Sequence, residues 1–423
     1  MSKSARKSAK IAAKQPSVAP NSGDGASISP YRLISQMEPL WPARAELEEK
    51  AIELLKRSQR LAGGLHPITQ RQVARLLRLM NSYYSNLIEG NVTHPLDLER
   101  AQHSDYSSEP RKKALQIEGK AHIEVEDLFE AELRNSPDLD VTSPEYLLRM
   151  HKAFYDRMPE EFKWVVTVGG ETLPVVSGAF RSKDVEVGHH VPPDPSAIPR
   201  FMERFHEVYT PGPLGSVRRI LAAAAAHHRL AWIHPFQDGN GRVTRLFTQL
   251  YFMRADLDSN GLWSLSRGLA RKQQEYYAAL EAADEHRYND YDGRGNLSQR
   301  GLDDFVSFLL DVSLDQVDFM SGLLDIDGML ERLTQYAELL SIRGELDSSA
   351  KYILTEIFLR GELARGDVPR IAGTSERNAR RITQRLSKLE LVHSETPLGP
   401  LCLNFPIKIV PIVFPALSPA AGI

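Results

Sequence analysis

The spacing of apolar residues predicts a mainly helical chain. Over most of the sequence these residues recur every three or four positions, which places them on one face of a helix. The segments with this spacing are about 46–62, 69–87, 112–134, 143–157, 196–209, 215–233, 241–254, 267–284 and 303–340. We therefore expect a body of packed helices whose ends are marked by glycine and proline.

The pattern changes between about residues 164 and 191, where valines are interspersed with glycines. Short runs of β-branched residues bounded by glycine are typical of strands. We therefore expect a small β insert, including a hairpin, within the helical body.

A second unit is predicted to begin near Asp347. Three helical segments follow, with the turn Gly373–Ser375 before the third, and this is the order of a helix-turn-helix. These segments are about 350–358, 368–372 and 376–389. Two short apolar runs around the turn 397–400 are expected to pair as a wing. The sequence thus predicts a winged-helix domain over 347–423.

The remaining chain divides into two parts. Residues 1–30 are rich in Ser, Lys, Ala, Pro and Gly and contain few large apolar side chains. Such a segment cannot bury enough surface to offset the entropy of ordering, so it is predicted to be a disordered basic tail. Residues 31–340 are predicted to form the main domain.

Composition and charge exclude several classes of protein. The chain has 52 Lys and Arg against 55 Asp and Glu, a net charge of −3, so any nucleic-acid binding must come from a local patch. The single cysteine, Cys402, excludes an internal disulfide and a cysteine-based zinc cluster. No apolar run approaches the roughly 18 residues of a membrane-spanning helix. We expect a soluble, cytoplasmic protein with no membrane association.

One segment combines several chemical groups. Residues 234–245 read His-Pro-Phe-Gln-Asp-Gly-Asn-Gly-Arg-Val-Thr-Arg. Pro235 disfavours the helical conformation for the residue before it, so His234 is expected at a helix end. Gly239 and Gly241 indicate a turn, and the backbone N–H groups of the helix that follows would form an anion site.

The charged residues of this segment indicate a nucleotide. Arg242 and Arg245 are three residues apart and project from one side of the helix, where two guanidiniums suit the β- and γ-phosphates. Asp238 beside the turn can hold Mg²⁺ against phosphate oxygens. The segment lacks the third glycine of a dinucleotide fingerprint and follows a helix, which argues against that alternative. The pair His227–His228 is more typical of core histidines than of metal ligands.

The segment resembles the motif of the Fic family, His-Pro-Phe-x-(Asp/Glu)-Gly-Asn-Gly-Arg-x-x-Arg, at every specified position. The resemblance implies the mainly α, Fic-type helical core with a small β-hairpin flap. Residues 178–193 are similar to that flap, which would clamp an extended target chain through main-chain pairing. The flap residues that would contact the target are Phe180, Arg181, Val185 and Val187. Ala231 departs from the family, many of whose members carry Glu there.

The resemblance also implies an activity. The family transfers AMP from ATP to a Ser, Thr or Tyr hydroxyl of a protein, which for this chain would be an unknown target or the chain itself. His234 would be the general base, Asp238 would bind Mg²⁺, and Arg242 and Arg245 would orient the β- and γ-phosphates. The α-phosphate would be held by Gly239, Asn240 and Gly241. Glycine at 241, where a kinase-like branch has Lys, favours nucleotidyl transfer.

A second motif lies upstream, in the residues from Ser85 to Asn91. From the residues alone it is a helix C-terminus, with Gly90 in the position that glycine prefers. Glu89 there opposes the negative end of the helix dipole unless a cation meets it. The motif resembles the family's inhibitory sequence (Ser/Thr)-x-x-x-Glu-(Gly/Asn)-Asn. This implies an inhibitory helix over about 69–91, with Glu89 paired with Arg245 in the position of the γ-phosphate.

Two other functions remain open from the sequence. Residues 367–393 carry six Lys and Arg against three acidic residues, a net charge of +3, so the winged helix could bind DNA. The chain would then be a DNA-binding regulator whose Fic core senses ATP or modifies the chain itself. Alternatively the same site could remove AMP, with Glu89 positioning a water. A homodimer is compatible with the sequence, which does not indicate the surface.

Overall fold

The computed structural model describes residues 29–166 and 170–417. The tail predicted over 1–30 therefore lies, except for its last two residues, outside the described residues. Among the residues described, no helix is both long and apolar enough to cross a membrane.

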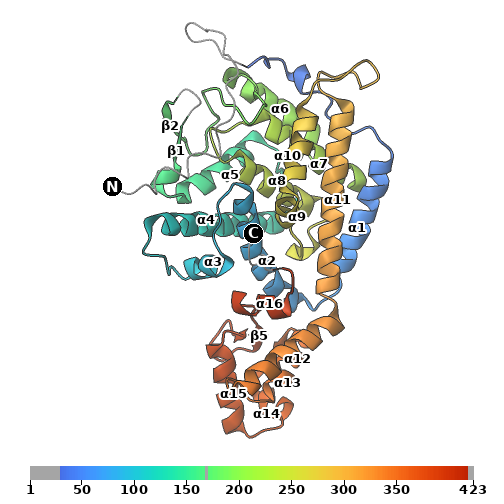
Figure 1. The fold of residues 1–423 in the computed structure, drawn as a ribbon. Helices are drawn as coiled ribbons and strands as arrows, with labels where there is room; N and C mark the ends of the chain where they lie inside the picture. The colour runs from blue at the N-terminus through green and yellow to red at the C-terminus, as the bar shows by residue number, and fades with distance from the viewer. Residues whose placement is uncertain (1–28, 167–169, 418–423) are drawn as a thin grey trace.

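The first body of the structure is built of helices, as Figure 1 shows. Its longer helices are α1 (Glu46–Ala62), α2 (Pro67–Ile88), α4 (Pro110–Asn135), α5 (Pro144–Arg157), α6 (Ile198–Tyr209), α7 (Ser216–Ile233), α8 (Asn240–Arg254), α10 (Gln273–Asp284) and α11 (Gln299–Leu323). Two shorter helices are α3 (Pro95–Gln102) and α9 (Leu265–Arg271). The predicted mainly helical fold class is confirmed.

Helix α7 lies at the centre of this body. It packs against α1, α6, α8 and α11, and the run Ala222–Ala226 has no exposed surface. Small side chains there allow neighbouring helices to approach closely. Most of α8 is buried as well. The loop that joins α7 to α8 is therefore held at both ends by elements of the core.

Two predicted helical stretches are divided. The stretch 267–284 forms α9 and α10, and the stretch 303–340 forms part of α11 and most of α12 (Ile326–Ile342). Asp325 stops the second stretch, because its side chain accepts a hydrogen bond from the N–H of Gly328 and so begins a new helix. The apolar spacing continues across this cap, and for this reason the sequence predicted a single helix over 303–340.

The β insert is smaller than predicted. Strands β1 (Trp164–Val166) and β2 (Thr172–Pro174) pair antiparallel, with Trp164 opposite Pro174. Within 175–191, all of it described, the chain forms a bridge between Val187 and His190 around a tight turn. The predicted hairpin over 178–193 is therefore a turn with one bridge, and the extended strands expected there do not form.

The C-terminal unit contains helices α12, α13 (Ala350–Arg360), α14 (Val368–Ile371), α15 (Glu376–Lys388) and α16 (Val410–Val413). Strands β3 (Glu362–Leu363), β4 (Val392–His393) and β5 (Leu401–Leu403) form a sheet in the order β3-β5-β4. Helix α12, placed in the first domain by the predicted boundaries, packs against α13 and α16. The winged-helix assignment and the domain boundaries stay predictions.

Helix α2 contacts both units. It packs against α4 and α9 in the first body and against β5 in the second. Its Thr69 hydroxyl donates to the carbonyl of Phe358 at 3.0 Å, and the Tyr84 hydroxyl donates to the carbonyl of Leu417 at 3.0 Å. Figure 1 shows α2 running from the middle of the helical body to the C-terminal unit. The helix that ends in the second motif is thus held from two sides.

Candidate active site

His234 stands at the end of α7 in a left-handed backbone conformation, with φ 48° and ψ 61°. Its N–H still donates to the carbonyl of Leu230, at 3.1 Å, and Pro235 prevents the helix from continuing. A left-handed conformation at a residue other than glycine is strained and persists only where its surroundings enforce it. The side chain is thereby presented at the helix end, as predicted from the sequence.

Arg181 enforces this conformation from the other side. Its Nε donates to the carbonyl of His234 at 2.8 Å, and its N–H donates to the carbonyl of Pro235 at 2.8 Å. Its Nη2 donates to the carbonyl of Pro193. Arg181 is buried. The donors of Arg181 hold the backbone of the motif loop, and its role as a flap contact stays a prediction.

The other predicted flap residues are placed differently. Phe180 is half-buried and lies against Phe236, with ring centroids 6.2 Å apart. Val185 is half-buried, whereas Val187 is 43% exposed and lines the cavity beside His234. Of the four, Val187 has the position expected of a residue that meets a target chain.

His234 lines a cavity of about 450 Å³ between the motif loop, α2 and α10. The other lining residues are Glu89, Val187, Gly188, His189, His190, Ala231, Trp232, Asn240, Gly241, Thr244, Arg245, Tyr276, Tyr277, Leu280, Glu281 and Asp284. Burial lowers the pKa of His234 to about 4, and the positive charge of Arg181 adds to the effect. The imidazole is therefore neutral at pH 7, the form that accepts a proton.

The turn that follows is shaped by Gly239 and Asn240. Gly239 has φ 82°, and a Cβ atom there would also meet the ring of Tyr155. The side chain of Asn240 closes the loop onto Phe236, accepting from its N–H at 2.9 Å and donating to its carbonyl at 2.8 Å. The amide of Asn240 is thus engaged, and the N–H groups of the first turn of α8 are what the loop presents to an anion.

Arg245 is bound to the second motif. Its Nε donates to the hydroxyl of Ser85 at 2.9 Å, and its Nη2 lies 2.7 Å from Oε1 of Glu89. Burial raises the pKa of Glu89, but the positive charges of Arg245 and Arg242 outweigh it and hold that pKa below its ordinary value. The expected contact between Glu89 and Arg245 is present. Any side chain at Gly241 would collide with the Glu89 carboxylate.

Arg242 is paired with a residue that the sequence did not single out. Its Nη1 contacts Oε1 of Glu118 on α4, and its Nη2 lies 3.6 Å from Oδ2 of Asp238. Asn91, predicted as part of the inhibitory motif, donates to both carboxylate oxygens of Glu118, at 3.0 and 2.9 Å. The two arginines of the motif are thus each matched by a carboxylate.

Asp238 is held at the edge of the site. The hydroxyl of Tyr155 donates to its Oδ2 at 2.7 Å, and its carbonyl accepts from Nε2 of His151 at 3.2 Å. His151 stacks on Phe236, with ring centroids 4.1 Å apart, and its Nδ1 accepts from the N–H of Gly178 at 3.0 Å. The Asp238 side chain is 42% exposed, so the carboxylate is positioned by protein groups and still open to solvent.

The fold and this site together define a helical protein in which the loop between two buried helices presents a neutral histidine to a cavity beside the N-terminus of α8. Comparison with known proteins matches residues 141–252 to the Fic/DOC family. The chain is 27% identical over 226 residues to the protein adenylyltransferase Fic of Nematostella vectensis, covering 53% of this chain and 49% of that protein. It is 42% identical over 86 residues to the protein adenylyltransferase Fic of Drosophila grimshawi, covering 20% and 18% of the two chains.

A solved structure agrees with the fold. A Fic family protein from Desulfovibrio desulfuricans G20 superposes with a TM-score of 0.51 at 17% identity, covering 87% of this chain and 98% of that one. This chain spans about half the length of the Nematostella relative. Residues 141–252 match the Fic/DOC family, and the predicted resemblance is confirmed over that segment.

Proposed function

We propose that this chain is a protein adenylyltransferase that transfers AMP from ATP to a Ser, Thr or Tyr hydroxyl of a target protein. The observation that carries the proposal is one cavity onto which the neutral imidazole of His234, the N-terminus of α8 and the guanidinium of Arg245 all open. The curated relatives named protein adenylyltransferase support it.

The reaction follows from these positions. His234 takes the proton of the target hydroxyl as its oxygen attacks the α-phosphorus. A new bond forms between that oxygen and the α-phosphorus, and the bond from the α-phosphorus to the bridging oxygen breaks, releasing pyrophosphate. The N–H groups at the start of α8 stabilise the negative charge that develops on the α-phosphate oxygens. Arg245, which lines the cavity, holds the γ-phosphate, and Arg242, buried beside Asp238, orients the β-phosphate through its charge, so that attack occurs in line.

The residues fit a magnesium ion at Asp238. The carboxylate is partly exposed, with Oδ2 engaged by Tyr155 and Arg242. Among the described residues there is no group of three or more His, Cys, Asp or Glu side chains suited to a metal. This arrangement suits Mg²⁺, which is usually held by one or two carboxylates together with waters and substrate phosphates. When bound, Mg²⁺ would neutralise charge on the pyrophosphate leaving group.

The same geometry supports autoinhibition by Glu89. The Glu89 carboxylate is paired with the guanidinium of Arg245 on the cavity wall. Without Glu89, that guanidinium would bind the γ-phosphate of ATP. Ser85 fixes that guanidinium from α2, and Asn91 anchors the turn behind Glu89. Since Glu89 also faces the cavity, it could instead position a water that removes AMP from a modified protein, which is the alternative direction of the reaction.

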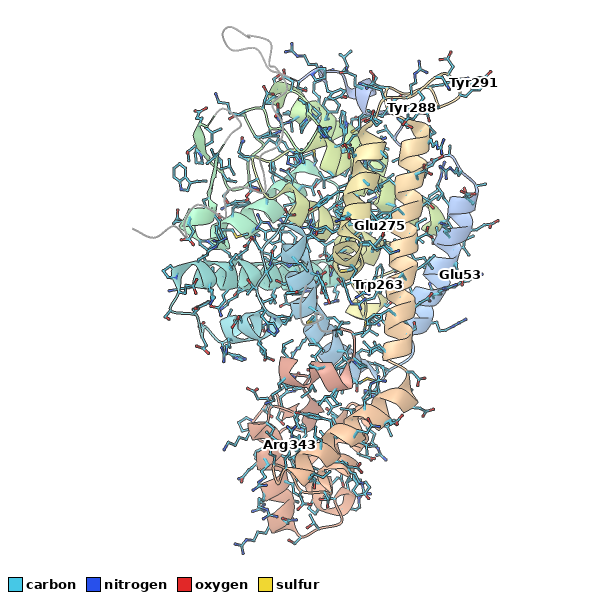
Figure 2. All side chains as sticks on the ribbon, viewed as in Figure 1. Glu53, Trp263, Glu275, Tyr288, Tyr291 and Arg343 are labelled. Carbon is cyan, nitrogen blue, oxygen red and sulfur yellow. The ribbon has the colours of Figure 1, made fainter. Side chains whose placement is uncertain are left out.

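The acceptor hydroxyl belongs to a target protein or to a second copy of this chain. Figure 2 shows Tyr288 and Tyr291 projecting from the loop after α10, at the end of the molecule opposite the C-terminal unit. Their exposed fractions are 75% and 99%. We propose these two tyrosines as acceptors for self-modification.

The proposal is tested with ATP labelled either in its α-phosphate or in its γ-phosphate. Protein that has been incubated with Mg²⁺ and α-labelled ATP is expected to carry the label, and protein given γ-labelled ATP is not. Label from the γ-phosphate would show phosphoryl transfer and contradict the proposal. If a protein that already carries AMP loses it in the presence of this chain and without added pyrophosphate, the reaction catalysed is removal of AMP.

The dependence of AMP transfer on pH should reflect the lowered pKa of the buried His234. The base works in its neutral form, so activity is present above the pKa of His234 and is lost as the pH falls through it. Because burial lowers that pKa to about 4, the acid limb of kcat/KM should lie well below the value of about 6.5 for an ordinary histidine. Labelling rates across pH, with circular dichroism to confirm folding at each point, measure it. A limb centred near pH 6.5 would contradict this placement.

DNA binding by the C-terminal unit is a second candidate function. The side chains of Arg380 and Arg381 on α15 are 80% and 63% exposed. Contacts of this kind with phosphates release counterions, so affinity for duplex DNA should fall steeply with salt. Filter binding across a salt series measures this, and replacing Arg380 by Ala should lower the slope by about one. If no duplex DNA is retained on the filter at low salt, the C-terminal unit does not bind DNA.

A further inference from the structure

Helix α4 carries a stripe of buried ionisable side chains. Glu118, His122, Glu126 and Glu130 follow at four-residue intervals, and each is at most 3% exposed. Side chains four residues apart share one helix face. Farther along this face, Glu126 and Glu130 both accept hydrogen bonds from Gln249 of α8, at 2.8 and 2.7 Å. Two carboxylates of α4 are thus bonded to α8.

Glu118 is the member of this stripe that reaches the phosphate site. Its carboxylate contacts Arg242 and accepts from Asn91. Burial raises its pKa, and the attraction of Arg242 offsets this only in part. Burying a charged carboxylate without partners is costly, and here a guanidinium and an amide supply them.

The pairs Glu118–Arg242 and Glu89–Arg245 differ in their relation to the cavity. Glu89 and Arg245 both line it, whereas Glu118 and Arg242 do not. The Glu89 side chain is 35% exposed, and that of Glu118 is 2% exposed. A nucleotide that enters the cavity can therefore displace Glu89. Glu118 contacts Arg242 outside the cavity, so a nucleotide there would not compete with it.

Building on the adenylyltransferase function proposed above, we infer that Glu118 is a positioning residue that holds Arg242 beside Asp238 for the chemical step. Arg242 lies between two carboxylates, with Glu118 in contact and Asp238 at 3.6 Å. Glu118 holds Nη1 of the guanidinium, and this keeps Nη2 at 3.6 Å from Oδ2 of Asp238. Without the charge of Glu118, Asp238 at 3.6 Å is the carboxylate that remains in ion-pair distance of Arg242, and the guanidinium moves toward it.

This position predicts a specific kinetic effect. An interaction that orients a group for the transition state lowers kcat when it is lost and leaves KM nearly unchanged. In a chain whose Glu89 is replaced by glycine, the further change Glu118→Gln is expected to lower kcat for AMP transfer by about ten- to a hundredfold, because misplacement by about 1 Å can cost that much. The KM for ATP is expected to change less than about twofold.

A matched control lies on the same helix face. Glu130→Gln removes a carboxylate of equal burial that pairs with Arg78 and not with the motif. In the same background it is expected to leave kcat within about twofold, since Glu130 does not contact the phosphate site. Thermal unfolding of both variants shows whether they fold. A Glu118→Gln chain as active as its parent, or a loss shared equally by Glu130→Gln, would overturn the inference.

Crystal structures of the wild-type and Glu118→Gln chains test the same point without activity. The guanidinium of Arg242 is expected to leave residue 118 and close on Asp238. An unmoved Arg242 would overturn the inference. If the Glu89→Gly parent itself transfers no AMP, the proposed function fails, and these structures still decide whether Glu118 positions Arg242.

Discussion

Replacing Glu89 by glycine is expected to raise AMP transfer by about tenfold or more. The carboxylate lies 2.7 Å from Nη2 of Arg245, and a hydrogen bond to a charged group contributes about 1.5–3 kcal/mol. Removing this competitor favours binding of the γ-phosphate by about ten- to a hundredfold. The side chain is 35% exposed, so solvent screening places the effect toward the lower end of that range. Labelling with α-labelled ATP measures the change.

The change Glu89→Gln separates charge from shape. It keeps the length of the side chain and removes the charge that pairs with Arg245, so it should also release transfer, though less than glycine does. Ser85→Ala removes the hydroxyl that accepts from Nε of Arg245 and is expected to have a smaller effect of the same sign. If Glu89→Gly labels no better than the wild-type chain, Glu89 is not an inhibitory residue.

In the Glu89→Gly background, replacing His234 by alanine is expected to lower transfer by about 10²- to 10⁴-fold, the usual contribution of a general base. His234 is the histidine at which the cavity, the helix end and the start of α8 meet. ATP binding should persist, because the N–H groups of α8 and the two arginines remain. Rates and calorimetric binding of ATP measured on the same preparations separate the two effects.

His103→Ala is a suitable control, since His103 is exposed at the end of α3 and does not line the cavity. It should leave the rate unchanged. Transfer that survives His234→Ala would show that another group takes the proton.

The sequence indicated the chemistry of the motif loop because neighbouring residues determine it. Pro235 ends a helix at His234, and Gly239 allows the left-handed turn before α8. The contact between Glu89 and Arg245 also followed, since the resemblance named both partners. Helix spans were predictable from apolar spacing, except where a local cap such as Asp325 divided one stretch.

Other features depended on contacts that no local pattern contains. Arg181 looked like a flap residue, but its donors meet the carbonyls of His234 and Pro235, which the fold brings to it. Asn240 looked like a phosphate ligand, but its amide closes the loop onto Phe236. In both cases a buried polar group needs a partner, and the nearest backbone supplied it.

By itself, the sequence determined that this chain is mainly helical and that its motif loop carries a histidine, a carboxylate and two arginines, because helix periodicity and turn chemistry are local. Only the tertiary structure decided which carboxylate meets each arginine. Glu118 lies 124 positions from Arg242, and its signal in the sequence was the four-residue spacing of ionisable side chains on α4. Packing α4 against α8 buries both charges together, and a buried guanidinium is stable only beside its counter-charge.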